Sequence, residues 1–430
     1  MTPALSLLLF MLVLTLVLRL PIGFGMLISG ISYLAFKRQD LGLASEQILN
    51  GLYNSYILLA VPLFIFAASV MNAGTVSERL FDFAQAIVGR LRGGLAHVNI
   101  IVSVIFSGMS GSAIADAAGP GIVSIRMMEK NGYSPEFAGA LTAASSTIGP
   151  IIPPSIPLVI YAMVSSASVG ALFLAGVIPG LMMAVALMVA VHFVAVRRGL
   201  PRGERLPLAA YPRILARGFL PLTLPVVLLG GIYTGVFTPT EAAAVAALYA
   251  LFLAGIVYKA LSWKRLYEIL VESSKASASV TLIIASAFII NYALTAENVP
   301  VLVANWLTGM QLSPTAFLLM VNILFLILGC LLDTSIMLLV LVPILLPTAK
   351  LLGIDLVHLG VVLAVNMMIG LITPPFGMLL FVINALAGVS LKGMIREGWL
   401  FIGVLLVALC VMTFVPQTVL WLPRMMGYAG

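Results

Sequence analysis

The sequence contains little charge, few cysteines and few histidines. Only 9% of its 430 residues are charged, 62% are hydrophobic, and the mean hydropathy is +1.18. Soluble domains contain about 25% charged residues, so this shortage excludes a water-exposed surface over most of the chain, and it excludes a disordered protein. Cys330 and Cys410 both lie in apolar segments, which indicates neither a disulfide framework nor a thiolate metal site. The three histidines show no metal-ligand spacing.

Long apolar segments make up most of the chain, and they are continuous rather than alternating. Backbone groups in hydrocarbon must be hydrogen-bonded within the chain, so such segments predict transmembrane helices and not barrel strands. We expect an all-α integral membrane protein with about ten transmembrane helices. Uninterrupted spans are predicted at residues 1–20, 21–36, 59–75, 171–196, 219–235, 238–258, 276–294 and 398–415.

Other segments differ from these spans in composition. Met1–Leu20 lacks the basic start of a signal peptide, so we expect it to remain in the mature protein. Residues 77–93 and 297–311 mix charged and apolar side chains, which predicts helices lying along the membrane interface. Residues 197–217 contain six arginines and predict a basic cytoplasmic linker between two halves, 1–196 and 218–430.

The two halves match each other when the sequence is shifted by 221 positions. Coincidence is the alternative explanation, because Gly and Pro are common in membrane helices. A single offset nevertheless accounts for every pair, so we interpret the halves as repeats. The aligned pairs are Gly108 and Gly329, Gly132 and Gly353, Gly149 and Gly370, Pro153 and Pro374, Pro154 and Pro375, and Ser112 and Asp333.

Each half contains a predicted re-entrant hairpin and a predicted broken helix. The hairpins, at about residues 98–130 and 314–352, are apolar segments interrupted by small polar residues, and each arm of about 15 residues is too short to cross a bilayer. The broken helices, at about residues 133–168 and 355–389, contain paired prolines that must unwind a helix. Ser134 and Asp355 occupy equivalent positions at their starts and predict N-caps.

The distribution of basic residues predicts that the repeats are inverted. With the N-terminus outside, ten alternating spans and opposed hairpins leave 18 of the 22 Lys and Arg residues on the cytoplasmic side. The four others are Lys37, Arg38, Lys350 and Arg424. We therefore interpret the net charge of +7 as a topology signal and not as a sign of nucleic-acid binding.

Inverted repeats with interrupted helices are typical of secondary transporters, because unwound segments expose carbonyls and amides at membrane depth. Hard cations such as Na⁺ bind oxygen donors, so small polar residues at the interruptions predict two mirrored sodium sites. Close helix packing is the alternative role for these small residues. The first predicted site comprises Ser107, Gly108, Ser110, Ser145 and Gly149, and the second comprises Gly329, Asp333, Asn366, Gly370 and Thr373. Substrate contacts are predicted at Ser112, Ser146, Thr147, Pro153, Pro154 and Pro374.

Acidic residues near the hairpin tips are functional candidates, because a carboxylate at membrane depth is costly. Asp116 is expected to cap or hydrogen-bond the second hairpin arm, whereas Asp333, at the tip itself, is expected to contact ion or substrate. Thr238 and Glu241 have the spacing of a capping box.

Parts of the sequence resemble motifs of two classes of intramembrane protease, serine and aspartyl. Gly108-Met-Ser110-Gly111 matches the short motif of intramembrane serine proteases, but such a serine needs a histidine, and Leu331 occupies the mirror position of Ser110. An aspartyl protease pair of Asp116 and Asp333 lacks the Gly-x-Gly-Asp context. We therefore expect no enzymatic activity, and the serine protease remains a distant alternative.

Four motifs resemble the large membrane subunit of tripartite ATP-independent periplasmic (TRAP) transporters. They are Ser110-Gly-Ser-Ala-Ile-Ala-Asp-Ala-Ala118, Thr142-Ala-Ala-Ser-Ser-Thr-Ile-Gly-Pro-Ile-Ile-Pro-Pro-Ser155 after Gly132-Tyr133, Thr238-Pro-Thr-Glu-Ala-Ala-Ala244 and Thr373-Pro-Pro-Phe-Gly377. The resemblance implies a bacterial inner-membrane sodium symporter with an elevator mechanism. It also implies two partners, a small four-helix membrane subunit and a periplasmic substrate-binding protein, and a small carboxylate substrate.

By the same resemblance, the sodium ligands come from Ser107, Gly108, Gly329, Gly370 and Thr373. A stand-alone divalent-anion sodium symporter shares the hairpin plan and remains the alternative function. Its typical Ser-Asn-Thr hairpin tips are absent from this sequence.

Overall fold

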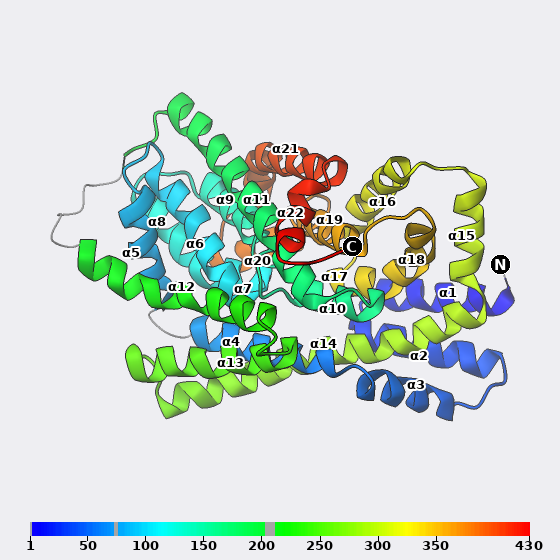
Figure 1. The fold of residues 1–430 in the computed structure, drawn as a ribbon. Coiled ribbons are helices and arrows are strands. Elements are labelled where there is room, and N and C mark those ends of the chain that lie inside the picture. Colours follow the sequence, from blue (N-terminus) through cyan, green and yellow to red (C-terminus); the bar gives the residue numbers. More distant parts are fainter. Residues whose placement is uncertain (1, 73–75, 203–210) are drawn as a thin grey trace.

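The computed structural model describes residues 2–72, 76–202 and 211–430, and these ranges form helices and no strand (Figure 1). Helices satisfy their backbone groups internally, as an apolar chain in lipid requires. The structure therefore confirms the predicted all-α class. The first half contains α1 (Pro3–Val17), α2 (Ile22–Phe36), α3 (Gly42–Tyr53), η1 (Tyr56–Leu59), α4 (Ala60–Asn72), α5 (Val76–Val88), α6 (Gly94–Ser110), α7 (Ala113–Asp116), η2 (Ala117–Gly121), α8 (Ile122–Lys130), α9 (Pro135–Ser146), α10 (Ile156–Ser165) and α11 (Val169–Arg198).

The second half repeats much of this order. It contains α12 (Tyr211–Tyr233), α13 (Pro239–Leu251), η4 (Phe252–Val257), α14 (Trp263–Ala296), α15 (Val299–Gly309), α16 (Pro314–Gly329), α17 (Thr334–Ile336), η5 (Met337–Leu341), α18 (Val342–Leu351), α19 (Leu356–Gly370), α20 (Met378–Ala387), α21 (Leu391–Phe414) and α22 (Gln417–Met425).

Five helices among the described residues are long and apolar enough to cross a membrane, and a sixth span arises if a bent pair is counted. Four of the five overlap the spans expected at 171–196, 238–258, 276–294 and 398–415, and the fifth is Thr334–Leu351. The bent pair joins Gly42–Tyr53 to Tyr56–Asn72 at 75°. Sequence patterns did not indicate α3 or α22, and part of the predicted linker is helical, because α11 continues to Arg198 and α12 begins at Tyr211. Residues 203–210 of that linker lie outside the described ranges.

The central elements of the two halves correspond closely. A pair of arms, α6 with α7–α8 and α16 with α17–α18, contains a π-helical turn in its second arm, η2 or η5. Each broken helix, α9–α10 or α19–α20, is interrupted at a cis proline pair, Pro153–Pro154 or Pro374–Pro375. Both cis proline pairs lie within the ranges expected for the broken helices, whereas the re-entrant course of the hairpins stays a prediction.

Helix caps agree with the sequence at the predicted positions. The Ser134 hydroxyl accepts a hydrogen bond from the backbone N–H of Phe137, and the Asp355 carboxylate accepts one from Val357. Thr238 and Glu241 form the expected capping box at the start of α13. Such caps satisfy free N–H groups of the first helical turn, and their partners lie within three residues, so local sequence alone predicts them.

The helices form two bodies that pack against each other (Figure 1). An outer layer contains α1, α2, α3, α4, α13 and α14, whose mutual contacts are extensive. The inner body contains the two arm pairs, both broken helices, α11 and α21. Helices α5, α12 and α15 contact both bodies, since α5 packs on α6 and α4, α12 on α6 and α13, and α15 on α18 and α14.

One carboxylate ties parts of the outer layer together. Glu297, at the end of α14, forms a salt bridge of 2.7 Å with Lys37 and accepts a hydrogen bond of 2.9 Å from the Tyr33 hydroxyl. The Thr2 hydroxyl donates to its other oxygen. The side chain of Glu297 is only 3% exposed. This cluster joins the N-terminus, the end of α2 and the end of α14.

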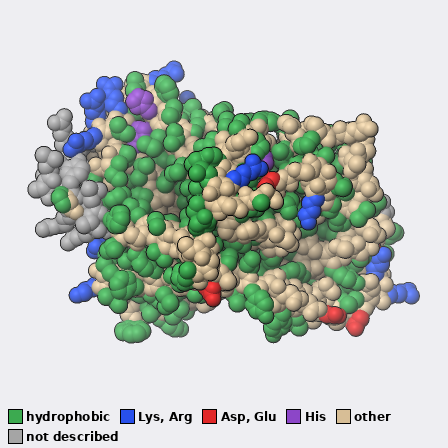
Figure 2. Space-filling view, in the orientation of Figure 1, with side chains coloured by type: hydrophobic (Ala, Val, Ile, Leu, Met, Phe, Trp, Pro, Cys, Tyr) green, Lys and Arg blue, Asp and Glu red, His purple; other side chains and the backbone are tan. Residues whose placement is uncertain are grey.

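Large hydrophobic side chains cover much of the surface (Figure 2). Examples are Phe10, Phe193, Trp263 and Trp306, each more than half exposed. A polar solvent would oppose such exposure, whereas lipid tails do not, so the surface fits a protein embedded in a bilayer.

Candidate functional site

The tip of the first arm pair rests directly on the first broken helix. Gly111, in the left-handed conformation at φ +59°, lies so close to the break that an added Cβ would be 2.4 Å from the Pro154 carbonyl oxygen. Gly149 approaches the tip from the other side, with the Ser112 carbonyl 3.4 Å from the position of its missing Cβ. The fold therefore brings together four residues predicted from sequence or adjacent to them.

The second arm pair meets the second broken helix through two glycines. A Cβ added at Gly370 would lie 2.8–2.9 Å from the backbone atoms of Gly329. A cavity of about 190 Å³ adjoins this contact and is lined by Gly329 and Leu371, among others. The alignment at offset 221 pairs Gly329 with Gly108, but Gly108 packs instead against Pro225 of α12. In both halves an arm tip therefore touches the broken helix, but the glycines that make the contact do not occupy equivalent positions in the two halves.

Helix ends converge at each of these contacts. Helices α6 and α9 end at the first contact, and α16 and α19 end at the second. The last carbonyls of a helix lack helical partners and form the negative end of its dipole. Beside them, α7 begins after its cap Ser112 and α10 after its cap Ser155, so free N–H groups of the opposite polarity lie nearby. Such an arrangement can bind a cation and an anion close together.

Two hydroxyls predicted to bind sodium, Ser107 and Thr373, and one predicted to contact substrate, Thr147, donate their hydrogen to their own helix. The Ser107 hydroxyl donates to the Val104 carbonyl at 2.5 Å, Thr147 donates to Ala144 at 2.6 Å, and Thr373 donates to Ile369 at 2.7 Å. Since the hydrogen of each hydroxyl is used in this way, its lone pairs remain available to accept a donor or to coordinate a cation.

Ser145 and Asn366, which the offset aligns, both bond to the first arm of their own half. Ser145 receives a hydrogen bond of 3.0 Å from Ser103 of α6. Asn366 donates to the side-chain and backbone oxygens of Asn322 on α16, at 2.8 and 2.9 Å. All four side chains are buried. These polar pairs fasten each broken helix to the adjacent arm.

Asp116 is fully buried, and the only groups found to face its carboxylate among the described residues are the Ser103 and Ser146 hydroxyls, which lie at the limit of hydrogen-bond geometry. The expectation that it caps or hydrogen-bonds the second arm is wrong, because Ser112 is the cap of α7 and the two hydroxyls belong to α6 and α9. A buried carboxylate with such weak pairing is costly, so this position needs a compensating charge or proton.

Three other predicted residues, Asp333, Ser110 and Pro374, lie at the arm tips or at the second break. Asp333 is half-buried and caps α17, since its carboxylate accepts a hydrogen bond of 2.8 Å from the Ser335 backbone. Ser110 is buried at the end of α6, and its hydroxyl lies 3.5 Å from the Ser112 backbone nitrogen. Pro374 belongs to the second cis pair. No sequence pattern indicated Ser103 or Asn322, because their roles depend on neighbours more than 40 residues away.

The two contacts belong to one body. Helix α10 of the first broken helix packs against α17, η5 and α18, and α20 of the second packs against α7, η2 and α8. The Tyr161 hydroxyl on α10 donates a hydrogen bond of 2.7 Å to the Leu356 carbonyl on α19. Each broken helix therefore contacts both arm pairs, and movement of one contact must affect the other.

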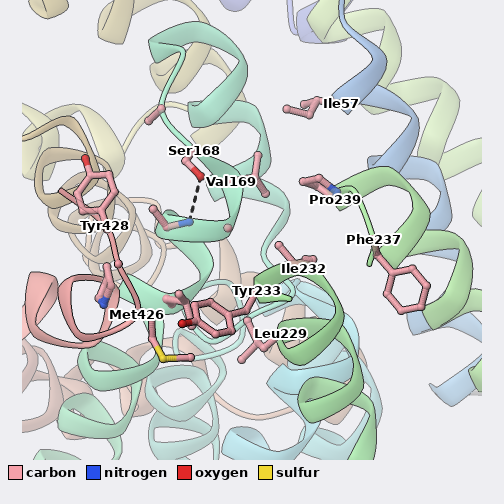
Figure 3. Close-up of a pocket in the computed structure, with 16 residues that line it drawn as sticks. Ile57, Ser168, Val169, Leu229, Ile232, Tyr233, Phe237, Pro239, Met426 and Tyr428 are labelled. Atoms are coloured by element: carbon pink, nitrogen blue, oxygen red, sulfur yellow. Dashed lines mark hydrogen bonds between the residues drawn. The ribbon is translucent and has the colours of Figure 1, made fainter. Parts of the chain in front are cut away.

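A crevice separates this body from the outer helices on one side (Figure 3). Its volume is about 520 Å³, and Ile232, Tyr233 and Phe237 line it from the end of α12 and the turn toward α13. Ser168 at the start of α11 and Tyr428 near the C-terminus line the opposite wall. None of the predicted ion or substrate residues lines this crevice.

Comparisons with known proteins agree with the sequence motifs. A family model described as the DctM component of the tripartite ATP-independent periplasmic transporter matches residues 9–418. The chain is 42% identical over 414 residues to the sialic acid TRAP transporter large permease protein SiaM of Vibrio cholerae, a match that covers 95% of this chain and 96% of that protein. It is 43% identical over 372 residues to the C4-dicarboxylate TRAP transporter large permease protein DctM of Pseudomonas aeruginosa, covering 86% and 87%. It is 35% identical over 402 residues to the 2,3-diketo-L-gulonate TRAP transporter large permease protein YiaN of Escherichia coli, covering 93% and 94%.

The fold also resembles a solved transporter. The crystal structure of the Alcanivorax borkumensis YdaH transporter superimposes with a TM-score of 0.64 over 86% of each chain, at 14% sequence identity. The named relatives are permeases, so the enzyme alternatives are rejected in favour of a membrane transport protein. With the family model spanning nearly the whole sequence and several large permeases more than a third identical to it, this chain belongs to the DctM component family of the tripartite ATP-independent periplasmic transporters.

Proposed function

We propose that this chain imports a small organic acid across the bacterial inner membrane, driven by sodium and by an elevator movement of its inner body. A periplasmic binding protein delivers the substrate, and a small four-helix membrane subunit completes the transporter. The observation that supports this proposal best is the pair of contacts between arm tips and broken helices, at Gly111 with Pro154 and at Gly329 with Gly370.

Sodium binding is supported by the kinds of oxygen donor at these contacts. Helix C-termini supply carbonyls, and Ser107 and Thr373 supply hydroxyl lone pairs. Hard cations bind such oxygen donors. No group of three or more His, Cys, Asp or Glu side chains gathers among the described residues, so the donor set does not suit a transition metal. Asp116 adds a buried carboxylate near the first contact, and the ionised form of this group would be stabilised by a cation there.

A carboxylate substrate is supported by helix N-termini at the same contacts and by the names of the relatives. The starts of α7 and α10 lie beside the first contact, and those of α17 and α20 beside the second, so free backbone N–H groups are available there for an anion. Relatives are named as transporters of sialic acid, C4-dicarboxylate and 2,3-diketo-L-gulonate, all of them organic acids. We infer a substrate of the same class for this chain.

Elevator movement is supported by the division into two bodies. Both broken helices, both arm pairs, α11 and α21 pack as one unit, whereas α1 to α4, α13 and α14 form a separate layer. The crevice of about 520 Å³ lies between parts of these bodies. Movement of one rigid body past another is a known way to alternate access to a fixed site. A thiol introduced as Ser112→Cys, with Cys330 and Cys410 replaced, should react with an impermeant reagent to an extent that changes with sodium and substrate.

Two hydroxyl substitutions test the sodium sites. Thr373→Val keeps the side-chain shape and removes one oxygen, as Ser107→Ala does at the first contact. Losing one ligand at roughly 1 to 3 kcal/mol should raise the half-saturating sodium concentration of uptake from about fivefold to over a hundredfold. Thr308→Val is the matched control, because Thr308 on α15 donates to the Ala304 carbonyl at 2.7 Å in the same way but lies away from both breaks.

Uptake is measured in proteoliposomes that contain both partner proteins. An unchanged sodium dependence in Thr373→Val and Ser107→Ala would reject the sodium sites. A separate measurement with the isolated chain tests the partners, because we expect no uptake until both are added. Robust uptake by the chain alone would instead favour the stand-alone divalent-anion symporter.

A further inference from the structure

Helices α11 and α21 pack against each other in the inner body. An apolar groove lies between them. The groove has a volume of about 760 Å³, and every residue that lines it is hydrophobic. It extends from Ile178 to Phe193 along α11, which at 1.5 Å per residue is about 22 Å. Half of a bilayer's hydrocarbon core is about 15 Å thick, so the groove is long enough for a complete acyl chain.

Basic side chains stand at one end of this groove. Arg197 lies four residues after the lining residue Phe193 on α11, and Arg396 lies four residues before the lining residue Leu400 on α21. A spacing of four places each arginine on the same helix face as the lining residue, one turn beyond the groove. Both arginines are exposed, and neither forms a salt bridge among the described residues. The two helices are joined at this end, because Arg198 and Glu397 form a salt bridge of 2.8 Å.

The charge at this end is predominantly positive. Lys392, at the start of α21, is exposed, and it adds a third cation without a salt bridge in the described part of the chain to Arg197 and Arg396. Glu136 is a nearby acid, because it packs against Gly393. The exposed indole of Trp399 lies one turn inside the basic cluster, where Trp side chains mark a membrane interface. The arrangement is therefore apolar along the helices and cationic where they meet the interface.

We propose that the groove binds an anionic phospholipid, with an acyl chain between α11 and α21 and the headgroup phosphate on Arg197 and Arg396. Guanidinium groups bind phosphate through paired hydrogen bonds, and basic pockets between transmembrane helices bind anionic headgroups. The headgroup lies in the leaflet that contains the C-terminus of α11. This site is separate from the arm tips and does not depend on sodium coupling.

An apolar helix of another protein is the competing occupant. Such a helix would bury the groove residues equally well, but it would not require cations at one end only. A molecule with an apolar tail and a single anionic head fits both features. The observations therefore favour a phospholipid over a protein partner.

The test is native mass spectrometry of the purified full chain, with phosphatidylglycerol and phosphatidylcholine of identical acyl chains. The wild-type protein should retain phosphatidylglycerol preferentially. Replacing both arginines, as R197Q with R396Q, should lower phosphatidylglycerol binding about tenfold and remove the preference. Val185→Trp should lower the binding of both lipids, because Val185 is 59% exposed in the groove and its replacement fills that space.

Two matched variants control for charge and bulk. K264Q with K275Q removes two exposed cations of α14, and Leu248→Trp adds an indole to an exposed position of α13. Both should bind lipid as the wild type does, and unfolding temperatures should show that all variants are folded. Equal binding of the two lipids by the wild type, or unchanged phosphatidylglycerol binding after loss of both arginines, would overturn the proposal. Complete loss of the lipid when the small membrane subunit is added, with Val189→Cys cross-linking to that subunit, would assign the groove to a protein interface instead.

Discussion

A methyl group added at Gly370 or at Gly329 tests the contact between the second arm tip and its broken helix. The two glycines touch each other, but they have unequal room. A Cβ at Gly370 would lie 2.8–2.9 Å from three backbone atoms of Gly329, whereas a Cβ at Gly329 would lie 3.5 Å from the nearest atom, the Cα of Gly370. Gly370→Ala therefore creates a collision with backbone, and Gly329→Ala creates an ordinary contact.

These distances set the displacement and the loss of stability expected for Gly370→Ala. Carbon atoms in good contact are about 3.5–4.0 Å apart, so Gly370→Ala must separate tip and break by about 0.6–1.2 Å. Overpacking of this kind costs about 1–3 kcal/mol. Both residues end a helix, and both gain at most about 1 kcal/mol of helix propensity from alanine. The difference between the two variants therefore isolates the collision.

The assays are thermal unfolding and sodium-dependent uptake with both partner proteins present. Gly370→Ala should unfold at a lower temperature and raise the half-saturating sodium concentration about tenfold, because displaced carbonyls bind the ion less well. Gly329→Ala should stay within about twofold of the wild type in uptake. Indistinguishable unfolding temperatures for the two variants would refute the contact. A destabilised Gly370→Ala protein with normal sodium dependence would keep the contact and refute its role in ion binding.

Three further predictions concern the first arm tip, the buried acid and the outer layer. Gly111→Ala should reduce stability and uptake by more than Gly132→Ala, because both glycines have positive φ but only Gly111 faces a carbonyl at 2.4 Å, and equal effects would contradict the tip contact. Asp116→Asn should leave the unfolding temperature unchanged or higher, since it replaces a buried ionisable group by a neutral one of the same shape, while uptake falls; parallel loss of both would indicate a structural role. The Lys37 ammonium and Thr2 hydroxyl lower the pKa of Glu297 to about 2 from its ordinary value of 4.5, so the stabilisation by this carboxylate is complete above about pH 4.5 and is lost as the pH falls toward 2. Glu297→Gln should unfold at a lower temperature at pH 7 and flatten the pH dependence in that window, and an unchanged acid profile would contradict the assignment.

Features with local causes were predictable from the sequence. Hydropathy alone located most long spans, because the bilayer sets their length and composition. The caps at Ser134, Asp355 and Thr238 depend on partners within three residues, so a short motif contains all the information needed. Paired prolines removed helical donors and thereby located both breaks.

Other features depend on residues far apart in the chain, and only the tertiary structure decided them. Sequence symmetry equated Gly108 with Gly329, yet Pro225 contacts the first and Gly370 the second. Asp116 was expected to cap or hydrogen-bond the second arm, but packing buried it beside the Ser103 and Ser146 hydroxyls of other helices. The basic end of the apolar groove exists because α11 and α21 lie side by side, about 200 residues apart in sequence. The sequence by itself determined that the chain is a membrane protein and where its helices and their interruptions lie, since these follow from local composition. Long-range packing determined which backbone and side-chain atoms meet at the breaks.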